Sequence, residues 1–175
     1  GLVRPAPVPA QPWLVYFAGN AMTLGVSQRV LEGAAGGAPW GLAVWAYRGY
    51  DGSEGDPTEE SLLADAVFLT RRLVERYAVA GPCIVLIGQS LGTGIAARVA
   101  VVLSRAGAAP AGLALLSPYT SMAAIFDDRV PLLPVGWLLA DSYRTDRLAT
   151  GVAGLPRIAG GRVAGGGSTP IVEEY

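Results

Sequence analysis

The sequence has 175 residues, of which 51% are hydrophobic and 15% are charged, and its net charge is -1. This length and composition predict one globular domain with a substantial buried core, and they exclude a disordered chain. The net charge gives no electrostatic basis for binding nucleic acid, and no apolar run approaches the ~18 residues that a membrane-spanning helix needs.

The chain opens with residues 1–12, which are rich in proline and predict an extended lead-in. An apolar, aromatic run at Trp13–Phe17 predicts a buried strand. A helix is expected over Thr23–Ala35, ended by Gly36-Gly37, and a second buried strand over Gly41–Tyr47.

The next helix has the clearest start signal in the chain and follows a polar, glycine-rich turn at residues 48–55. Asp56 is the predicted N-cap, Pro57 the first helical position, and Glu59 the residue that reaches back to the cap nitrogen. Apolar residues then follow at helical spacing: Leu62, Leu63, Ala66, Leu69, Leu73 and Tyr77. Gly81-Pro82 is predicted to end this element.

Two further strands, Cys83–Ile87 and Ala111–Leu116, flank a largely apolar helix over Leu91–Ala106. Cys83 is the only cysteine, which excludes an internal disulfide. Continuous apolar strands that alternate with helices predict an α/β fold with a mostly parallel sheet and helices on both faces. Ligands bind at the carboxyl ends of the strands in such sheets. We assign residues 13–153 to this core and residues 154–175 to a glycine-rich C-terminal segment.

The stretch IGQSLGTG joins the third predicted strand to the helix after it. Residues 88–92 match the pattern G-x-S-x-G, which places a serine on a tight strand-to-helix turn. This context predicts Ser90 as a nucleophile, with Gly88 and Gly92 as the elbow glycines that relieve crowding around it. The alternative is a structural, glycine-rich turn without chemistry.

A serine nucleophile also needs an oxyanion hole, which usually has two donors. The backbone N–H of Leu91 follows the nucleophile at the start of a helix and is the first candidate. The second candidate is the backbone N–H of Asn20, in the loop after the first predicted strand. That loop could equally be a simple connection.

Four motifs occur in this order: FAGNAMTLG, AYRGYDGSEG, IGQSLGTG and LLSPYTSM. Together they resemble the alpha/beta-hydrolase superfamily, over about residues 13–148. The resemblance is closer to a branch with the patterns H-G-N-A, Y-R-G-Y-x-x-S-x-G, G-Q-S-x-G and S-P-x-T-S. That branch includes membrane-associated acyl-protein thioesterases and serine-aminopeptidase-like hydrolases.

This resemblance implies an incomplete alpha/beta-hydrolase fold, of which the chain holds the middle of the sheet. It also implies Ser90 as the nucleophile and Asn20 and Leu91 as the oxyanion donors. Ala18 departs from the pattern, because the family has at this place a histidine that shapes the loop. The family's catalytic aspartate is expected near Gly165–Gly167, which carries no carboxylate.

The sequence contains no histidine and no lysine, so neither a Ser-His nor a Ser-Lys pair can form within it. Several carboxylates follow the fourth predicted strand: Asp127, Asp128, Asp141 and Asp146. A carboxylate with a pKa near ~4 is a poor base for a serine hydroxyl. We therefore expect this chain by itself to be nearly inactive.

Three functions remain open. The first is a serine hydrolase acting on ester or thioester bonds of a small-molecule or acylated substrate, with this sequence as a C-terminally truncated copy. The second is a hydrolase-fold pseudoenzyme or binding module without turnover. The third, a non-hydrolytic doubly wound domain with a chance serine turn, leaves the other three motifs without a reason.

No cofactor, metal site or nucleic-acid partner is expected for any of these functions. Residues Trp137–Leu139 fit either an apolar lid over an acyl pocket or the packing of a helix. The sequence is compatible with peripheral contact with a membrane, and the expected location is the cytoplasm or the membrane periphery. An incomplete sheet leaves one edge exposed, which predicts self-association through that edge.

Overall fold

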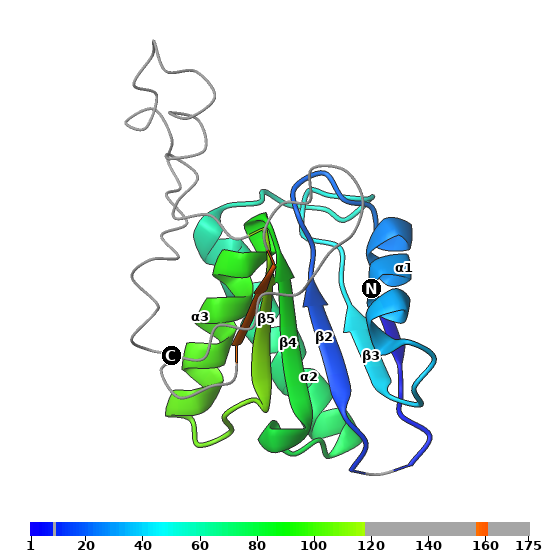
Figure 1. Cartoon of the computed structure of the whole chain (residues 1–175). Helices are drawn as coiled ribbons and strands as arrows, with labels where there is room; N and C mark the ends of the chain where they lie inside the picture. Colours follow the sequence, from blue (N-terminus) through cyan, green and yellow to red (C-terminus); the bar gives the residue numbers. More distant parts are fainter. Residues whose placement is uncertain (9, 118–156, 161–175) are drawn as a thin grey trace.

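The computed structural model describes residues 1–8, 10–117 and 157–160. These residues form a six-stranded sheet with the strand order β1-β3-β2-β4-β5-β6 and helices against it (Figure 1). The elements are β1 (Leu2–Arg4), β2 (Trp13–Phe17), α1 (Leu24–Ala35), β3 (Gly41–Val44), α2 (Glu59–Tyr77), a 3₁₀ turn (Gly81–Cys83), β4 (Ile84–Gln89), α3 (Leu91–Arg105), β5 (Gly112–Leu116) and β6 (Arg157–Gly160). The predicted α/β class is confirmed.

The sheet is mostly parallel, with β1 antiparallel to β3 and every other neighbouring pair parallel. The crossover from β2 to β3 runs in one direction along the sheet, and the crossovers from β3 to β4 and from β4 to β5 run in the other. Right-handed crossovers in opposite directions put their helices on opposite faces. Helix α1 therefore covers one face, and α2 and α3, which pack on each other, cover the other.

Two strands of the sheet were not predicted from the sequence. Strand β1 lies within the proline-rich lead-in, where Leu2 pairs with Val44 and Arg4 pairs with Leu42. Strand β6 lies within the glycine-rich segment 154–175 and pairs with β5. Strands this short depend on the neighbouring strand for their hydrogen bonds, and their sequences carry no period that would reveal them.

Helix α2 begins later than predicted, because its N-cap is Thr58 and not Asp56. Thr58 has extended backbone angles, φ -76° and ψ 156°, and its hydroxyl oxygen accepts from the N–H of Ser61 at 3.2 Å. The carbonyl of Asp56 instead accepts from the N–H of Thr58 at 3.1 Å, which forms a separate turn before the helix. Pro57 lies in that turn, and Glu59 is the first helical residue and not the partner of a capping box.

The other predicted elements are confirmed with shifts at their ends. Helix α1 is capped by Thr23, and Gly36 ends it in the left-handed conformation with φ 57°. Strand β3 ends at Val44, three residues earlier than predicted, whereas β4 continues to Gln89. The longer β4 brings the sheet directly to the predicted nucleophile.

The core is centred on β2, β3 and β4 and on the inner side of α3. Its fully buried large side chains include Val15, Tyr16, Leu42, Val44, Ile84, Leu86, Ile95 and Val99. Helix α3 is buried along most of its length, as its apolar sequence predicts. None of the helices in the described part of the chain combines the length and the hydropathy needed to cross a bilayer.

Candidate active site

Ser90 lies on a tight turn between β4 and α3, at the carboxyl end of the sheet. Its backbone angles, φ 47° and ψ -117°, fall in a region that residues with a Cβ rarely adopt. The N–H of Ser90 donates to the carbonyl of Leu116 on β5 at 2.9 Å. The N–H and the hydroxyl of Thr93 donate to the carbonyl of Ser90 at 2.8 Å and 2.6 Å. The turn is thus held by backbone contacts on both sides, and the side chain of Ser90 makes no capping bond to α3.

The two glycines that flank Ser90 are required by close approach of backbones. A Cβ at Gly88 would lie 2.4 Å from the carbonyl oxygen of Gly92, and a Cβ at Gly92 would lie 2.0 Å from the carbonyl oxygen of Phe17. Both distances are far below van der Waals contact. The first turn of α3 therefore packs directly on the ends of β4 and β2, which only glycine permits at these positions.

The loop after β2, which carries the sequence AGNAM, lies against the serine turn. A Cβ built on Gly19 would lie 3.5 Å from the Cβ of Ser90 and 3.4 Å from the carbonyl oxygen of Gln89. The N–H of Gly19 donates to the sulfur of Met22 at 3.2 Å, which turns the loop back on itself. The structure thus brings the loop of Asn20 next to Ser90, the arrangement that a two-donor oxyanion hole requires.

Leu91 is buried and is the first residue of α3, so its backbone N–H belongs to the amino end of a helix. That end carries a partial positive charge, which favours a developing oxyanion. Asn20 lies on the exposed side of the same site. Both candidate donors therefore come from segments that meet at the serine turn.

Tyr16 of β2 links its strand to Gln89, the residue before Ser90. Its hydroxyl donates to the side-chain carbonyl of Gln89 and also lies 3.7 Å from the sulfur of Met22. Burial raises the pKa of Tyr16 to about 12. The hydroxyl is protonated at neutral pH and donates to Gln89, the residue before Ser90.

The structure also shows two tyrosine contacts that the sequence analysis missed. The hydroxyl of Tyr47 donates to the carbonyl of Ala18 at 2.9 Å, and the hydroxyl of Tyr50 donates to Oδ1 of Asn20 at 2.7 Å. Both tyrosines come from the YRGY motif after β3. The sequence predicts a polar, glycine-rich turn at this motif and a resemblance to a known family, and nothing in its spacing points to the loop at residues 18–20.

The sequence has no histidine and no lysine that could act as a general base for Ser90. The candidate carboxylates Asp127, Asp128, Asp141 and Asp146 lie outside the described residues. The possible lid at Trp137–Leu139 and the segment Gly165–Gly167 lie outside them as well.

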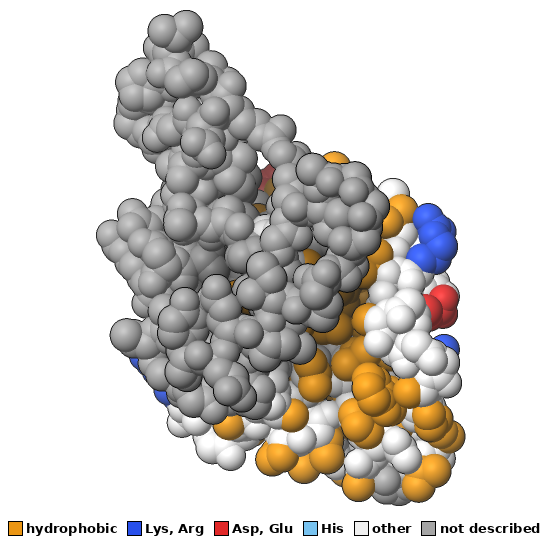
Figure 2. All heavy atoms as spheres, in the orientation of Figure 1, with side chains coloured by type: hydrophobic (Ala, Val, Ile, Leu, Met, Phe, Trp, Pro, Cys, Tyr) orange, Lys and Arg blue, Asp and Glu red, His pale blue; other side chains and the backbone are white. Residues whose placement is uncertain are grey.

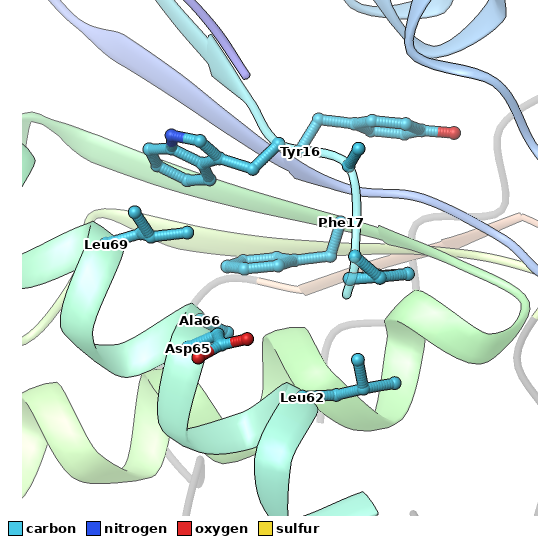
Figure 3. A pocket seen from close by; sticks show the side chains of 9 residues that line it. Tyr16, Phe17, Leu62, Asp65, Ala66 and Leu69 are labelled. Carbon is cyan, nitrogen blue, oxygen red and sulfur yellow. The ribbon is translucent and has the colours of Figure 1, made fainter. Parts of the chain in front are cut away.

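A pocket opens near the site, between α2 and the ends of β2 and β3 (Figure 3). It has a volume of about 330 Å³, part of it open to solvent, and its lining residues are Tyr16, Phe17, Trp45, Ala46, Tyr47, Leu62, Asp65, Ala66 and Leu69. Figure 3 shows Phe17 extending from the sheet toward the residues of α2. Ser90 is not among the lining residues, so this pocket adjoins the serine turn through β2 and does not contain it.

Comparison with known proteins decides the superfamily. No protein-family profile matches the chain. A crystal structure of an alpha/beta hydrolase from Vibrio vulnificus matches 84% of this chain and 55% of its own, with a TM-score of 0.75 and 22% identity. An uncharacterised protein of Mycobacterium tuberculosis is 39% identical over 124 residues, which are 69% of this chain and 42% of the relative. The human protein ABHD12B is 34% identical over 146 residues, which are 78% of this chain and 39% of the relative. The chain belongs to the alpha/beta-hydrolase superfamily.

A third relative is the lysophosphatidylserine lipase ABHD12 of Danio rerio. It is 36% identical over 115 residues, which cover 65% of this chain and 29% of that protein. The chain thus spans less than half the length of all three curated relatives. The superfamily predicted from the four motifs is confirmed, and the closer thioesterase-like branch stays a prediction.

Proposed function

We propose that this alpha/beta-hydrolase chain carries the nucleophile of a serine hydrolase that acts on acyl ester or thioester bonds. The observation that supports it most is the placement of Ser90 on a strained elbow, with the loop of Asn20 packed against it. The relative in Danio rerio is named as a lipase, and this name favours an acyl ester as the substrate class.

In the proposed reaction, the Oγ of Ser90 forms a bond to the acyl carbon, and the carbonyl electron pair moves onto its oxygen. The N–H groups of Leu91 and Asn20 would donate to that oxyanion. The proton of the hydroxyl passes to a base. The oxyanion then re-forms the carbonyl as the bond from carbon to the leaving oxygen or sulfur breaks, and the base gives the proton to that leaving group. Water finally hydrolyses the acyl-serine to the acid and free Ser90. Neither a histidine nor a lysine is present in this sequence to act as that base.

The missing base allows a direct test by chemical rescue. Loss of a triad member costs roughly 10⁴ to 10⁶ in turnover, so the chain alone should react slowly with a fluorophosphonate probe. Added imidazole at neutral pH supplies a diffusible base, and we expect it to accelerate covalent labelling at Ser90. The rate is measured by intact mass spectrometry, and the modified residue by peptide mapping.

Two variants make this test specific. Ser90→Ala should remove the imidazole-dependent labelling and also correct for reaction of imidazole with the probe in solution. Ser104→Ala, which removes a hydroxyl from the far end of α3, should label like the unmodified chain. Labelling that survives Ser90→Ala would overturn the proposal.

The absence of histidine favours one second candidate, a binding module that keeps the fold without turnover. This candidate predicts that Ser90 stays unlabelled in the folded chain even when imidazole is present. The site would then still bind a non-hydrolysable acyl analogue, and calorimetry would measure that binding.

A further inference from the structure

We propose that the turn Tyr47–Asp51 is a clamp that positions the oxyanion loop, residues 18–23, beside Ser90. This inference rests on the proposed function of Ser90. Tyr47, Tyr50 and Asp51 are positioning residues, because they act on the reaction through the loop that they hold. The clamp fastens the loop at its beginning, its middle and its end.

The first contact fixes the beginning of the loop. The hydroxyl of Tyr47 donates to the carbonyl of Ala18 at 2.9 Å, and both residues are buried. A buried carbonyl that loses its donor carries a desolvation penalty, so this bond strongly favours one loop position. The donor to the carbonyl of Ala18 thus comes from outside the loop, in addition to the contacts between Gly19 and Met22 within it.

The second contact fixes the middle of the loop. The hydroxyl of Tyr50 donates to Oδ1 of Asn20 at 2.7 Å. The rings of Tyr47 and Tyr50 meet edge to face, with centroids 6.0 Å apart and an interplanar angle of 84°, a favourable aromatic geometry. Each tyrosine thereby limits the movement of the other. The contact from Tyr50 holds Asn20, whose backbone N–H is the proposed oxyanion donor.

The third contact fixes the end of the loop. Oδ2 of Asp51 accepts from the N–H of Leu24, the first residue of α1, at 2.6 Å. The hydroxyl oxygen of Thr23 accepts from the N–H of Val26 in the same helix turn. A carboxylate at a helix amino end is favourable both as a hydrogen-bond acceptor and as a charge. Asp51 thus determines where the loop enters α1.

The turn itself is anchored away from the loop, which allows it to act as a clamp. Arg48 forms a fork with Asp65 of α2, at 2.7 Å from Nε to Oδ2 and 2.6 Å from Nη2 to Oδ1. This hydrogen-bonded pair raises the pKa of Arg48 further, so the guanidinium is always charged. Gly49 has φ 73°, and a Cβ there would lie 2.9 Å from the carbonyl oxygen of Gly55. The turn is therefore closed on itself and joined to α2.

Amide hydrogen exchange on the full 175-residue chain tests the clamp without any need for activity. Tyr47→Phe and Tyr50→Phe each remove one hydroxyl and keep the ring. We expect the amides of Gly19 and Met22, which are hydrogen-bonded within the loop, to exchange about fivefold faster in both variants. The amides of β4 should exchange at unchanged rates, which separates a local effect from loss of global stability.

Tyr77→Phe is the matched control. Tyr77 lies on α2, and its ring packs on Trp13 with centroids 5.0 Å apart, remote from the oxyanion loop in sequence and contact. The exchange of Gly19 and Met22 should not change in this variant. Loop exchange that equals that of the unmodified chain in both Tyr47→Phe and Tyr50→Phe would overturn the clamp.

Imidazole-assisted labelling of Ser90 gives the second readout. Varying the fluorophosphonate concentration separates its reversible binding constant from the maximal labelling rate. A positioning role predicts that Tyr50→Phe lowers the maximal rate by about tenfold and leaves the binding constant unchanged. An unchanged maximal rate in both clamp variants would overturn the role in positioning. If Ser90 of the unmodified chain is never labelled, the proposed function fails, and the exchange data alone decide the clamp.

Discussion

At the scale of single residues, Gly92 offers the sharpest test of the serine turn. Its absent Cβ would lie 2.0 Å from the carbonyl oxygen of Phe17, and a strand end cannot move away as a flexible side chain can. We expect Gly92→Ala to lower the free energy of unfolding by about 3 kcal/mol. Urea denaturation followed by tryptophan fluorescence measures the change.

Gly33→Ala is the control for this substitution. Gly33 lies within α1, and a Cβ there meets nothing within 4 Å. Alanine in an open helical position should raise the free energy of unfolding by about 0.5 to 1 kcal/mol. A destabilisation by Gly92→Ala no larger than that of an ordinary surface substitution would contradict the packing described for the turn.

Residue-level prediction from the sequence succeeded where the pattern itself encodes geometry. The spacing of Gly88, Ser90 and Gly92 specifies a crowded strand-to-helix turn, and the structure has that turn. The contacts of Tyr47 and Tyr50 with the loop after β2 join positions 29 and 30 residues apart. No local periodicity reports such contacts, because they arise only when β2 and β3 lie side by side.

At the scale of elements, the start of α2 differs between sequence and structure, because the sequence predicts Asp56 as the N-cap and the structure has Thr58 there. Thr58→Ala removes the hydroxyl oxygen that accepts from Ser61 and should lower the free energy of unfolding by about 1 kcal/mol. Asp56→Ala should change it by less than about 0.5 kcal/mol, because the backbone of Asp56 and not its carboxylate makes the contacts to Thr58 and Ser61. Thermal and urea unfolding of both variants measure the difference. A larger loss in Asp56→Ala than in Thr58→Ala would contradict the observed helix start.

Elements with a strong period or a long apolar run could be predicted, and short ones could not. Trp13–Phe17 is buried at every residue, and its apolar run predicts a strand. Leu2–Arg4 has three residues and a mixed burial pattern, so only its pairing with β3 defines it. The predicted cap of α2 is wrong because Asp56 and Thr58 are both good capping residues, and only the contact of the Thr58 hydroxyl with Ser61 shows which of them caps the helix.

At the scale of the whole molecule, β1 protects an edge of the sheet. Its antiparallel pairing covers the outer side of β3. Hydrophobic side chains gather at the lower right of the described surface in Figure 2, where the segment between β1 and β2 lies in Figure 1. Removing residues 1–7 should therefore leave the outer edge of β3 unpaired, which favours association.

Light scattering after size-exclusion chromatography measures this effect. The shortened chain should show a larger mass than the full chain at equal concentration, and a lower unfolding midpoint. Val8→Ser, which changes a 54% exposed residue of the same segment, should leave both values unchanged. If the shortened chain has the same mass in solution and the same unfolding midpoint as the full chain, β1 does not protect the edge of β3.

The position of the site within the molecule followed from the sequence, because parallel strands place their carboxyl ends at one edge and the serine follows such an end. The chemistry of the site did not follow in the same way. A hydrolase needs a base held near Ser90, and the sequence has no histidine from any position to supply it. The turn at Ser90 is local and could be recognised from five residues, whereas a triad is assembled from distant segments.

The backbone strain at Ser90 lowers the stability of the fold at the same position where the proposed reaction needs a serine. A serine at φ 47° and ψ -117° carries a cost of about 1 to 3 kcal/mol, whereas glycine adopts such angles readily. The bond to Leu116 and the contacts of Gly88 and Gly92 would serve a glycine at position 90 equally well. Among descendants released from the need for a nucleophile, thermal stability alone would thus favour replacement of Ser90 by glycine, while the glycines on either side would persist.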